Sequence, residues 1–335
     1  EPPVHTRHRS LVAGAFARGH VKRLGPAIAA EAVALVNRAG PSFDLLADVA
    51  EPLAVTVIAE LLGVPASDRS KLRPWSAAIV RMYEVSRTGQ EETAAVDAAR
   101  EFADYLRDLA ARRRAEPQDD LISHLVAVRD GTDRLSGDEL VASAILLLNA
   151  GHEASVNTLG GGVVALLRHP DQLARLRADP GLLPTAAEEM IRYDPPLHLF
   201  IRTAAADVQV AGVTIAAGQE VAALLGAANR DPAVFTDPDS FDAGRDPNPH
   251  LGFGAGLHFC LGAPLARIEL RAGLAALLRH GPNLALATDP THRPTFVLRA
   301  YTKIPLTTTP VRFPGRRSAT PRTADEATPD RPARP

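Results

Sequence analysis

The sequence predicts a mainly α-helical protein with a small β region and one long helix through its centre. Three observations predict it. Apolar residues recur at helical spacing over most of residues 4–193, one helical pattern continues from 136 to 168, and short β-type runs begin only after residue 196. With 335 residues, 46% of them hydrophobic, the chain can bury a large core in one or two domains.

Composition excludes several partner classes. The formal net charge is −2 and the longest block of like charge is Arg112–Arg114, so neither nucleic acid nor an anionic membrane is expected as a principal ligand. The most apolar run, 140–151, is too short to span a bilayer, and there is no signal-peptide pattern. One cysteine excludes a disulfide within the chain and favours a reducing, cytoplasmic location.

The first helix is predicted over 4–18, after a double proline. It carries His5 and Arg9 four residues apart, and therefore on one face. A solvated basic face is the simpler interpretation of this pair. Further helices are predicted at 26–39, 49–62, 67–86, 91–115, 119–128 and 184–193.

The long helix begins at a capping box of Ser136 with Glu139 and continues to Arg168, about 50 Å at about 1.5 Å per residue. Its first half is apolar nearly all round, as in a helix that crosses a core. Polar residues then interrupt the apolar face between 149 and 157. We expect the helix to open near Gly151 into a groove for a small ligand, with a kinked core helix as the alternative.

Cys260 lies between a glycine-rich loop, 252–256, and a predicted helix that starts after Leu261. Free N–H groups at a helix N-terminus favour the thiolate, the form that binds metals. A single sulfur ligand suits haem iron better than structural zinc, which takes about four side chains. The simplest alternative is a small buried hydrophobic residue.

The β region is predicted at 197–204, 208–215 and 219–226, with the middle run folding back as a hairpin. An ordered loop without periodicity follows at 229–250. The runs 294–300 and 303–309 are predicted to pair as a last hairpin. The domain is expected to cover 1–315, and the charged, proline-rich tail 316–335 to be disordered.

The cysteine segment resembles the haem-binding signature FGxGxHxCxG of the cytochrome P450 family. Every position of that pattern is filled, by Phe253, Gly254, Gly256, His258, Cys260 and Gly262. The resemblance implies the haem-thiolate fold with its long central helix crossing the haem. It also implies haem b with Cys260 as the axial ligand of iron, and Phe253 and Gly262 shielding the sulfur.

Three further motifs occur in the family's order. By resemblance, His5 and Arg9 hold a haem propionate, and Arg202 pairs with a propionate as well, because these carboxylates need fixed cationic donors. Glu189 and Arg192 match the family's ExxR pair. That pair is structural, and Arg245 is its expected third partner.

The run AGHEAS, 150–155, is similar to the family's oxygen-activation motif AGxETT, which places Ala150 and Gly151 at the haem. Glu153 is the acid of this motif, but Ala154 stands where a threonine usually delivers protons. A methyl group cannot relay a proton, so the relay is expected through Ser155, ordered water or a hydroxyl of the substrate. Certain macrolide hydroxylases share this alanine.

The resemblance implies insertion of one oxygen atom from O2 into a C–H bond of a small molecule, which we expect to be a bulky, hydroxylated natural product. Electrons would come from a ferredoxin and its NAD(P)H-dependent reductase, because no flavin or nicotinamide domain is recognisable. Arg267 and Arg271 are candidates for the docking face, or are simply solvated. The helices at 67–86 and 91–115 would form a lid, with side chains that face the ligand or fill the core: Trp75, Ile79, Met82 and Tyr83.

Two alternatives belong to other classes. A haem-binding protein without monooxygenase activity would explain Ala154 and the start of the chain at the first propionate helix, with the N-terminal part of the family fold missing. A zinc or cysteine-nucleophile hydrolase would use His250, His258 and Cys260. It leaves the Glu189–Arg192 pair unexplained.

Overall fold

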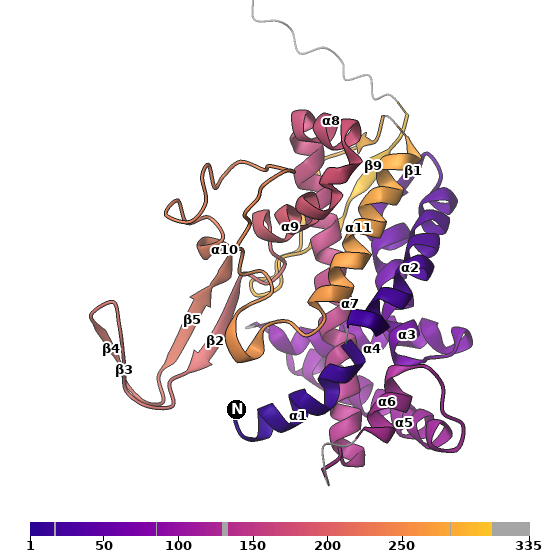
Figure 1. The fold of residues 1–335 in the computed structure, drawn as a ribbon, viewed down its shortest axis with the longest axis vertical. Helices are drawn as coiled ribbons and strands as arrows, with labels where there is room; N and C mark the ends of the chain where they lie inside the picture. Colours follow the sequence, from indigo (N-terminus) through magenta and orange to yellow (C-terminus); the bar gives the residue numbers. More distant parts are fainter. Residues whose placement is uncertain (17, 85, 129–132, 282, 310–335) are drawn as a thin grey trace, which may run out of the picture.

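A computed structural model describes residues 1–309 except 17, 85, 129–132 and 282. The protein is mainly helical, and α7 (Gly137–Arg168) runs through its middle between the other helices (Figure 1). The predicted fold class, mainly α with a small β region, is confirmed. The tail predicted at 316–335 lies outside the described residues.

The helices follow the predicted order, with shifted ends at the start of the chain. The first helix ends at Ala13 instead of 18, and the second begins at Arg18, two turns before its predicted start, with Pro26 inside it. Besides α7, the α-helices are α1 (Val4–Ala13), α2 (Arg18–Ala39), α3 (Glu51–Leu62), α4 (Arg69–Val80), α5 (Gly89–Ala115), α6 (Leu121–Ala127), α8 (Pro170–Ala178), α9 (Leu183–Tyr193), α10 (Leu225–Ala228) and α11 (Ala263–His280).

The predicted capping box starts α7. The Ser136 side chain accepts from the Glu139 N–H, and the Glu139 carboxylate accepts from the Ser136 N–H. The helix then stays α-helical to Arg168, so the expected opening near Gly151 is wrong. Asn157 and Thr158 donate to carbonyls one turn back, which satisfies their side chains without unwinding the helix.

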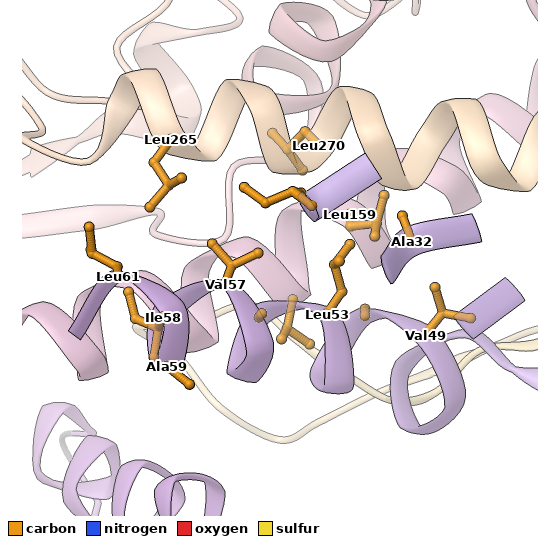
Figure 2. Close-up of a cluster of buried hydrophobic side chains, with 14 of the residues drawn as sticks. Ala32, Val49, Leu53, Val57, Ile58, Ala59, Leu61, Leu159, Leu265 and Leu270 are labelled. Carbon is orange, nitrogen blue, oxygen red and sulfur yellow. The ribbon is translucent and has the colours of Figure 1, made fainter. Parts of the chain in front are cut away.

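The core lies where α3 and α11 pack against α7 and α2. Figure 2 shows Leu53 and Val57 of α3 pointing towards Leu159 of α7 and Leu270 of α11. Gly273 lets α11 approach α7 closely, because a Cβ there would lie 2.9 Å from a Leu159 methyl carbon. This packing fixes α11, the helix that follows the cysteine loop, against α7.

The end of α3 is locked to the start of α6. Gly63 takes the left-handed conformation at φ 79°, and its carbonyl accepts a hydrogen bond from Arg113 at 2.7 Å. Arg113 also pairs with Asp120, the buried residue that caps α6. A side chain at position 63 would collide with the Asp120 carboxyl group.

The predicted lid residues lie in α4 and in the turn that follows it, and they differ in burial. Trp75 is buried, stacks on Phe102 at 5.0 Å and donates to Glu101 at 3.0 Å, so it belongs to the core. Ile79 also packs against the core, whereas Met82 and Tyr83 are exposed. Within the described ranges, no helix combines the length and hydropathy needed to cross a bilayer.

The strands of the described residues form small antiparallel sheets. β2 (Leu199–Thr203) pairs with β5 (Glu220–Leu224), and β3 (Val208–Val210) with β4 (Val213–Ile215), as the predicted hairpin. Figure 1 shows these strands extending away from the helices.

The predicted last hairpin is wrong. β8 (Tyr301–Lys303) pairs with β7 (Thr291–His292), and β9 (Pro305–Thr307) lies between β1 (Ser42–Asp44) and β6 (Ala285–Leu286). The Ile304 N–H between β8 and β9 donates to Asp44, so the chain passes from one sheet to another at that residue.

Candidate haem site

The cysteine loop closes on itself before α11. The Cys260 N–H donates to the Phe253 carbonyl at 2.9 Å, and Gly254 and Gly256 take φ values of 68° and 66° between them. Glycine adopts this left-handed backbone without strain. Gly262 adjoins the thiol, since a Cβ there would lie 4.0 Å from Sγ. The loop therefore presents a half-buried sulfur just ahead of α11.

The thiol of Cys260 is not a thiolate by default. Burial raises its pKa above the ordinary value, and hydrogen bonds from the Gly262 and Ala263 N–H groups lower it by less. The N–H groups at the start of α11 therefore favour the thiolate, as expected, but burial outweighs them. In this setting a metal ion is what would stabilise the anion.

An ion pair between α9 and α11 supports the loop from behind. Glu188 accepts two hydrogen bonds from Arg267, at 2.7 and 2.8 Å, and lies 3.1 Å from Nε2 of His250. The Arg267 guanidinium also lies over the Phe253 ring, 4.7 Å from its centre. Arg267 is thus ion-paired beside the loop and not simply solvated, and its docking role stays a prediction. Arg271 is half-buried as well.

Basic groups from two distant segments meet beside the cysteine loop. Arg9 donates to the Phe259 carbonyl at 2.5 Å, and the rings of His5 and His258 lie 4.2 Å apart. Figure 1 shows the start of α1 next to the loop that leads into α11. Desolvation, together with the neighbouring His258 and Arg9, lowers the pKa of His5. The cluster therefore favours an anion.

A carboxylate lies in this basic cluster. Glu1 Oε1 is 2.9 Å from Nε2 of His258, and this hydrogen bond lowers the pKa of Glu1. Nδ1 of His5 is buried and has no hydrogen-bond partner among the described residues. The contact with Glu1 places a carboxylate against His258, one member of the cluster.

Arg202 is placed on β2, opposite Val221 of β5. Its guanidinium donates to the Ile201 carbonyl at 2.9 Å and lies over the Phe200 ring. These contacts lie within its own strand, and none of them joins it to the basic cluster beside the cysteine loop.

One face of α7 is open although the helix is central. Leu146 is 58% exposed, and Ala150 and Ala154 follow it at intervals of four residues. Gly151 lies on another side, where a Cβ would come 2.7 Å from Ile58 of α3. Ala150 and Ala154 therefore share the open face, and Gly151 serves helix packing.

Glu153 of α7 is held by two side chains. Asn157 donates to its carboxylate at 3.3 Å, and Nη1 of Arg293 lies 3.9 Å from Oε2. Arg293 comes from the chain between α11 and β8, and no motif of the sequence predicts its role. A single arginine in an irregular segment carries no pattern that would reveal its partner.

Ser155 faces α11, where it is hydrogen-bonded to Glu269. Both residues are buried, and burial raises the pKa of Glu269 to about 8, so the carboxyl group stays protonated at neutral pH. Glu269 was not among the predicted site residues, although the sequence contains a pattern that indicates it. The residue lies four positions after Leu265, on the apolar stripe of its helix.

Glu189 collects hydrogen bonds in a fully buried position. Arg192 donates to both of its oxygens, at 2.7 and 2.8 Å, and Arg245 donates at 3.1 and 3.2 Å. Asn248 and the Asp242 N–H complete the set. The structure thus brings together the three residues of the expected ExxR group and fastens α9 to the loop 236–248.

These residues fit a haem. The loop offers one sulfur, the basic cluster accepts carboxylates such as the two haem propionates, and an apolar helix face is left open. Cys260 would hold the iron, and His5, Arg9 and His258 would hold propionates.

The hydrolase alternative lacks its constellation. Both ring nitrogens of His250 are engaged, Nε2 with Glu188 and Nδ1 with the Gly252 N–H. Among the described residues, no group of three or more His, Cys, Asp or Glu side chains is arranged to hold a metal ion. A zinc site of His250, His258 and Cys260 is therefore unsupported.

Comparison with known proteins agrees with this geometry. The cytochrome P450 family model matches residues 40–180 and 181–293. The 6-deoxyerythronolide B hydroxylase of Saccharopolyspora erythraea is 43% identical over 91% of this chain and 76% of its own length. The mycinamicin IV hydroxylase/epoxidase of Micromonospora griseorubida is 44% identical over 87% and 73%.

A solved structure, that of P450BioI with an acyl carrier protein carrying hexadec-9Z-enoic acid, superposes with a TM-score of 0.88. It is 40% identical, and the match covers 92% of this chain and 80% of that one. The family-model match extends over α7, the Glu189 group and the cysteine loop together. The chain therefore belongs to the cytochrome P450 family of haem-dependent monooxygenases, which use O2 as co-substrate.

Proposed function

We propose that this chain inserts one oxygen atom of O2 into a C–H bond of a small natural product, with Cys260 as the thiolate ligand of haem iron. The observation that carries the proposal is the closed cysteine loop beside the basic cluster of His5, Arg9 and His258. These groups meet although about 250 residues separate them in sequence. Arg202 would add a further cation only if its side chain turned away from its own strand.

When bound, the haem supplies O2 activation, and reducing the second oxygen atom to water consumes two protons and two electrons. The chain's part is to deliver those protons at the open face of α7. Ala154 offers no hydroxyl there, and Ser155, the next residue, is buried and turned towards Glu269 of α11, so its hydroxyl would join the proton path only through ordered water. Glu153, held by Asn157 and Arg293, is the second acid near this face.

The relay at Ala154 needs an oxygen that the chain does not place there. We propose that ordered water or a hydroxyl of the substrate supplies it. The names of two relatives, hydroxylases of 6-deoxyerythronolide B and of mycinamicin IV, support a bulky natural product as substrate.

Electrons are proposed to come from a ferredoxin, reduced by its NAD(P)H-dependent reductase, in the cytoplasm. The support is the family resemblance, together with the single cysteine. No described residue is assigned to this docking.

The test of the proposed function is spectroscopic. Purified protein supplied with haem, reduced and exposed to carbon monoxide is expected to give the red-shifted Soret band of thiolate ligation, and Cys260→Ser is expected to lose it. A Soret band unaltered by the Cys260 substitution would end the proposal. Turnover of a substrate then separates an oxygenase from a protein that only binds haem.

Ala154→Thr tests the relay with the first substrate found by a screen for changes in the haem spectrum. If substrate or water organises the proton path, the added hydroxyl is expected to leave product formation and peroxide release unimproved. Faster turnover with less peroxide would instead indicate that the missing threonine is a simple deficit.

A further inference from the structure

The loop 293–300 is a closed unit that carries two groups of interest. The Arg293 N–H donates to the Ala300 carbonyl at 2.8 Å, and the Thr295 hydroxyl donates to the Leu298 carbonyl at 2.6 Å. Arg293, at one end, lies beside Glu153. Phe296, at the tip, is 70% exposed. Whatever holds this loop therefore positions both side chains.

The tip of the loop borders a cavity of about 360 Å³ at the ends of β2 and β5. Leu199 and Leu224 give it apolar walls, and Thr295 and Phe296 belong to the loop itself. His198 and Arg299 provide the polar part of the lining. Because Thr295 and Phe296 form part of its wall, the shape of the cavity depends on where the loop stands.

One side of the loop is already fixed to the segment 194–197, which joins α9 to β2. Arg299 pairs with Asp194 at 2.8 Å, and its N–H donates to the Pro196 carbonyl at 2.8 Å. Leu298 forms a β-bridge with Leu197. These contacts hold the second half of the loop and leave the tip to another anchor.

Glu84 is that anchor. This residue is only 7% exposed and lies just after the turn 81–83, which follows α4. The carboxylate accepts from the Phe296 N–H at 3.1 Å and from the Leu298 N–H at 3.4 Å. Among the described residues no basic side chain pairs with it. A buried carboxylate needs such donors, so releasing the loop would leave a charge without partners.

We propose that Glu84 is a positioning residue for the oxidation, because its carboxylate fixes Phe296 at the cavity and keeps Arg293 beside Glu153. The inference rests on the proposed function, since the loop matters to the reaction only where the cavity admits substrate. It also links the α4 end of the predicted lid to the acid on α7.

The first test is amide hydrogen exchange of segment 293–300, measured by mass spectrometry in the haem-loaded full chain. Glu84→Gln, which keeps one neutral acceptor oxygen, is expected to speed exchange at Phe296 and Leu298 severalfold. Glu84→Ala, which removes both acceptor oxygens, is expected to speed it by about tenfold or more. Glu101→Gln is the matched control. It removes the same charge from α5 but only the contact with Trp75. Exchange in Glu84→Ala equal to that in Glu101→Gln would overturn the proposal.

The second test separates positioning from general damage. Imidazole and the bulky azole econazole are titrated into the haem-loaded protein and followed by the haem spectrum. Glu84→Gln is expected to weaken econazole about fivefold or more and to leave imidazole unchanged, because only the larger molecule reaches the loop. Phe296→Ala should show the same selectivity, and the two substitutions together should add little.

Equal effects on both azoles, or no effect on econazole, would reject a role for Glu84 at the cavity. A chain that fails to take up haem would instead reject the proposed function. Exchange measured on that haem-free chain would still report whether Glu84 holds the loop, so the two failures are distinguishable.

Discussion

Glu189 shows how one residue fastens the region beneath the cysteine loop. Its two oxygens accept from Arg192, Arg245, Asn248 and the Asp242 N–H, and the residue is 0% exposed. The buried carboxylate and its two guanidinium partners stabilise one another, because removing any one of them leaves an uncompensated charge in the core.

Glu189→Gln is therefore expected to cost about 3 to 5 kcal/mol of unfolding free energy, since Arg192 would remain buried without its counter-charge. Urea denaturation measures the loss. Asp104→Asn breaks an exposed pair with Arg107 and should change stability by less than about 1 kcal/mol. Similar values for the two variants would show that the Glu189 group is not a fastening point.

Glu269 makes stability depend on pH. Its pKa is about 8 in the folded chain, against 4.5 as the ordinary value, so between these pH values the unfolded chain binds fewer protons. Stability consequently falls as pH rises through that window. His152 acts in the opposite direction, because burial lowers its pKa to about 4 and stability then rises with pH up to about 6.5.

Of these two groups, Glu269 dominates the change of stability with pH above about pH 6.5. Between pH 7 and 8, wild type is expected to lose about 1 kcal/mol relative to Glu269→Gln, which keeps the contact with Ser155 but cannot ionise. Denaturant midpoints at both pH values give the difference. A parallel pH dependence in the two proteins would contradict a protonated Glu269.

For single residues, a sequence motif can predict which residue is functional, but it does not predict which distant residue that side chain contacts. The sequence could place Cys260, Glu153 and Glu189, because each belongs to a motif with fixed spacing. It could not find Glu84 or Arg293, whose contacts are more than a hundred residues away in the chain. Their partners include backbone N–H groups, which leave no mark on a sequence.

Among the elements, the end of α3 depends on one glycine for two reasons. Gly63 needs a positive φ, and its missing side chain leaves room for Asp120, which holds Arg113. Gly40, between α2 and β1, shares the first reason only, because its φ is 76° and nothing lies within 4 Å of a Cβ there.

Gly40→Ala should therefore cost about 1 kcal/mol from backbone strain alone. Gly63→Ala should cost that much and at least about 2 kcal/mol more, because Asp120 must leave a buried ion pair. Thermal and urea denaturation of the two variants supply the comparison. Equal losses of unfolding free energy in the two variants would show that backbone strain explains the whole destabilisation and that the α3–α6 contact contributes nothing to it.

Helices were more predictable than strand partners. The box of Ser136 and Glu139 is local, so the start of α7 could be predicted to the residue. The last hairpin was wrong because β9 pairs with β1, whose residues precede it by about 260 positions. Adjacent short strands do not reveal such a partner, since strand pairing depends on the packed helices between them.

The whole molecule leaves apolar surface open where the proposed haem would lie, as at Leu146 and Phe259. Haem binding is expected to raise the melting temperature, with a gain of about 4 kcal/mol when free haem is about 1,000 times its dissociation constant. His5→Ala with Arg9→Ala should reduce that gain by weakening the grip on propionates. Calorimetry with and without haem measures the gain in stability for wild type and for the double variant. An equal gain in the two proteins would show that His5 and Arg9 do not bind the propionates.

The pairing of Arg267 with Glu188 bears on how an electron donor finds this protein. The guanidinium is neutralised internally at 2.7 Å and covered on one side by Phe253, so it projects little field into solution. Long-range steering of an acidic partner must draw on other cations. Raising the ionic strength would then slow that encounter as much after Arg267→Gln as before, while the same substitution would loosen the cysteine loop.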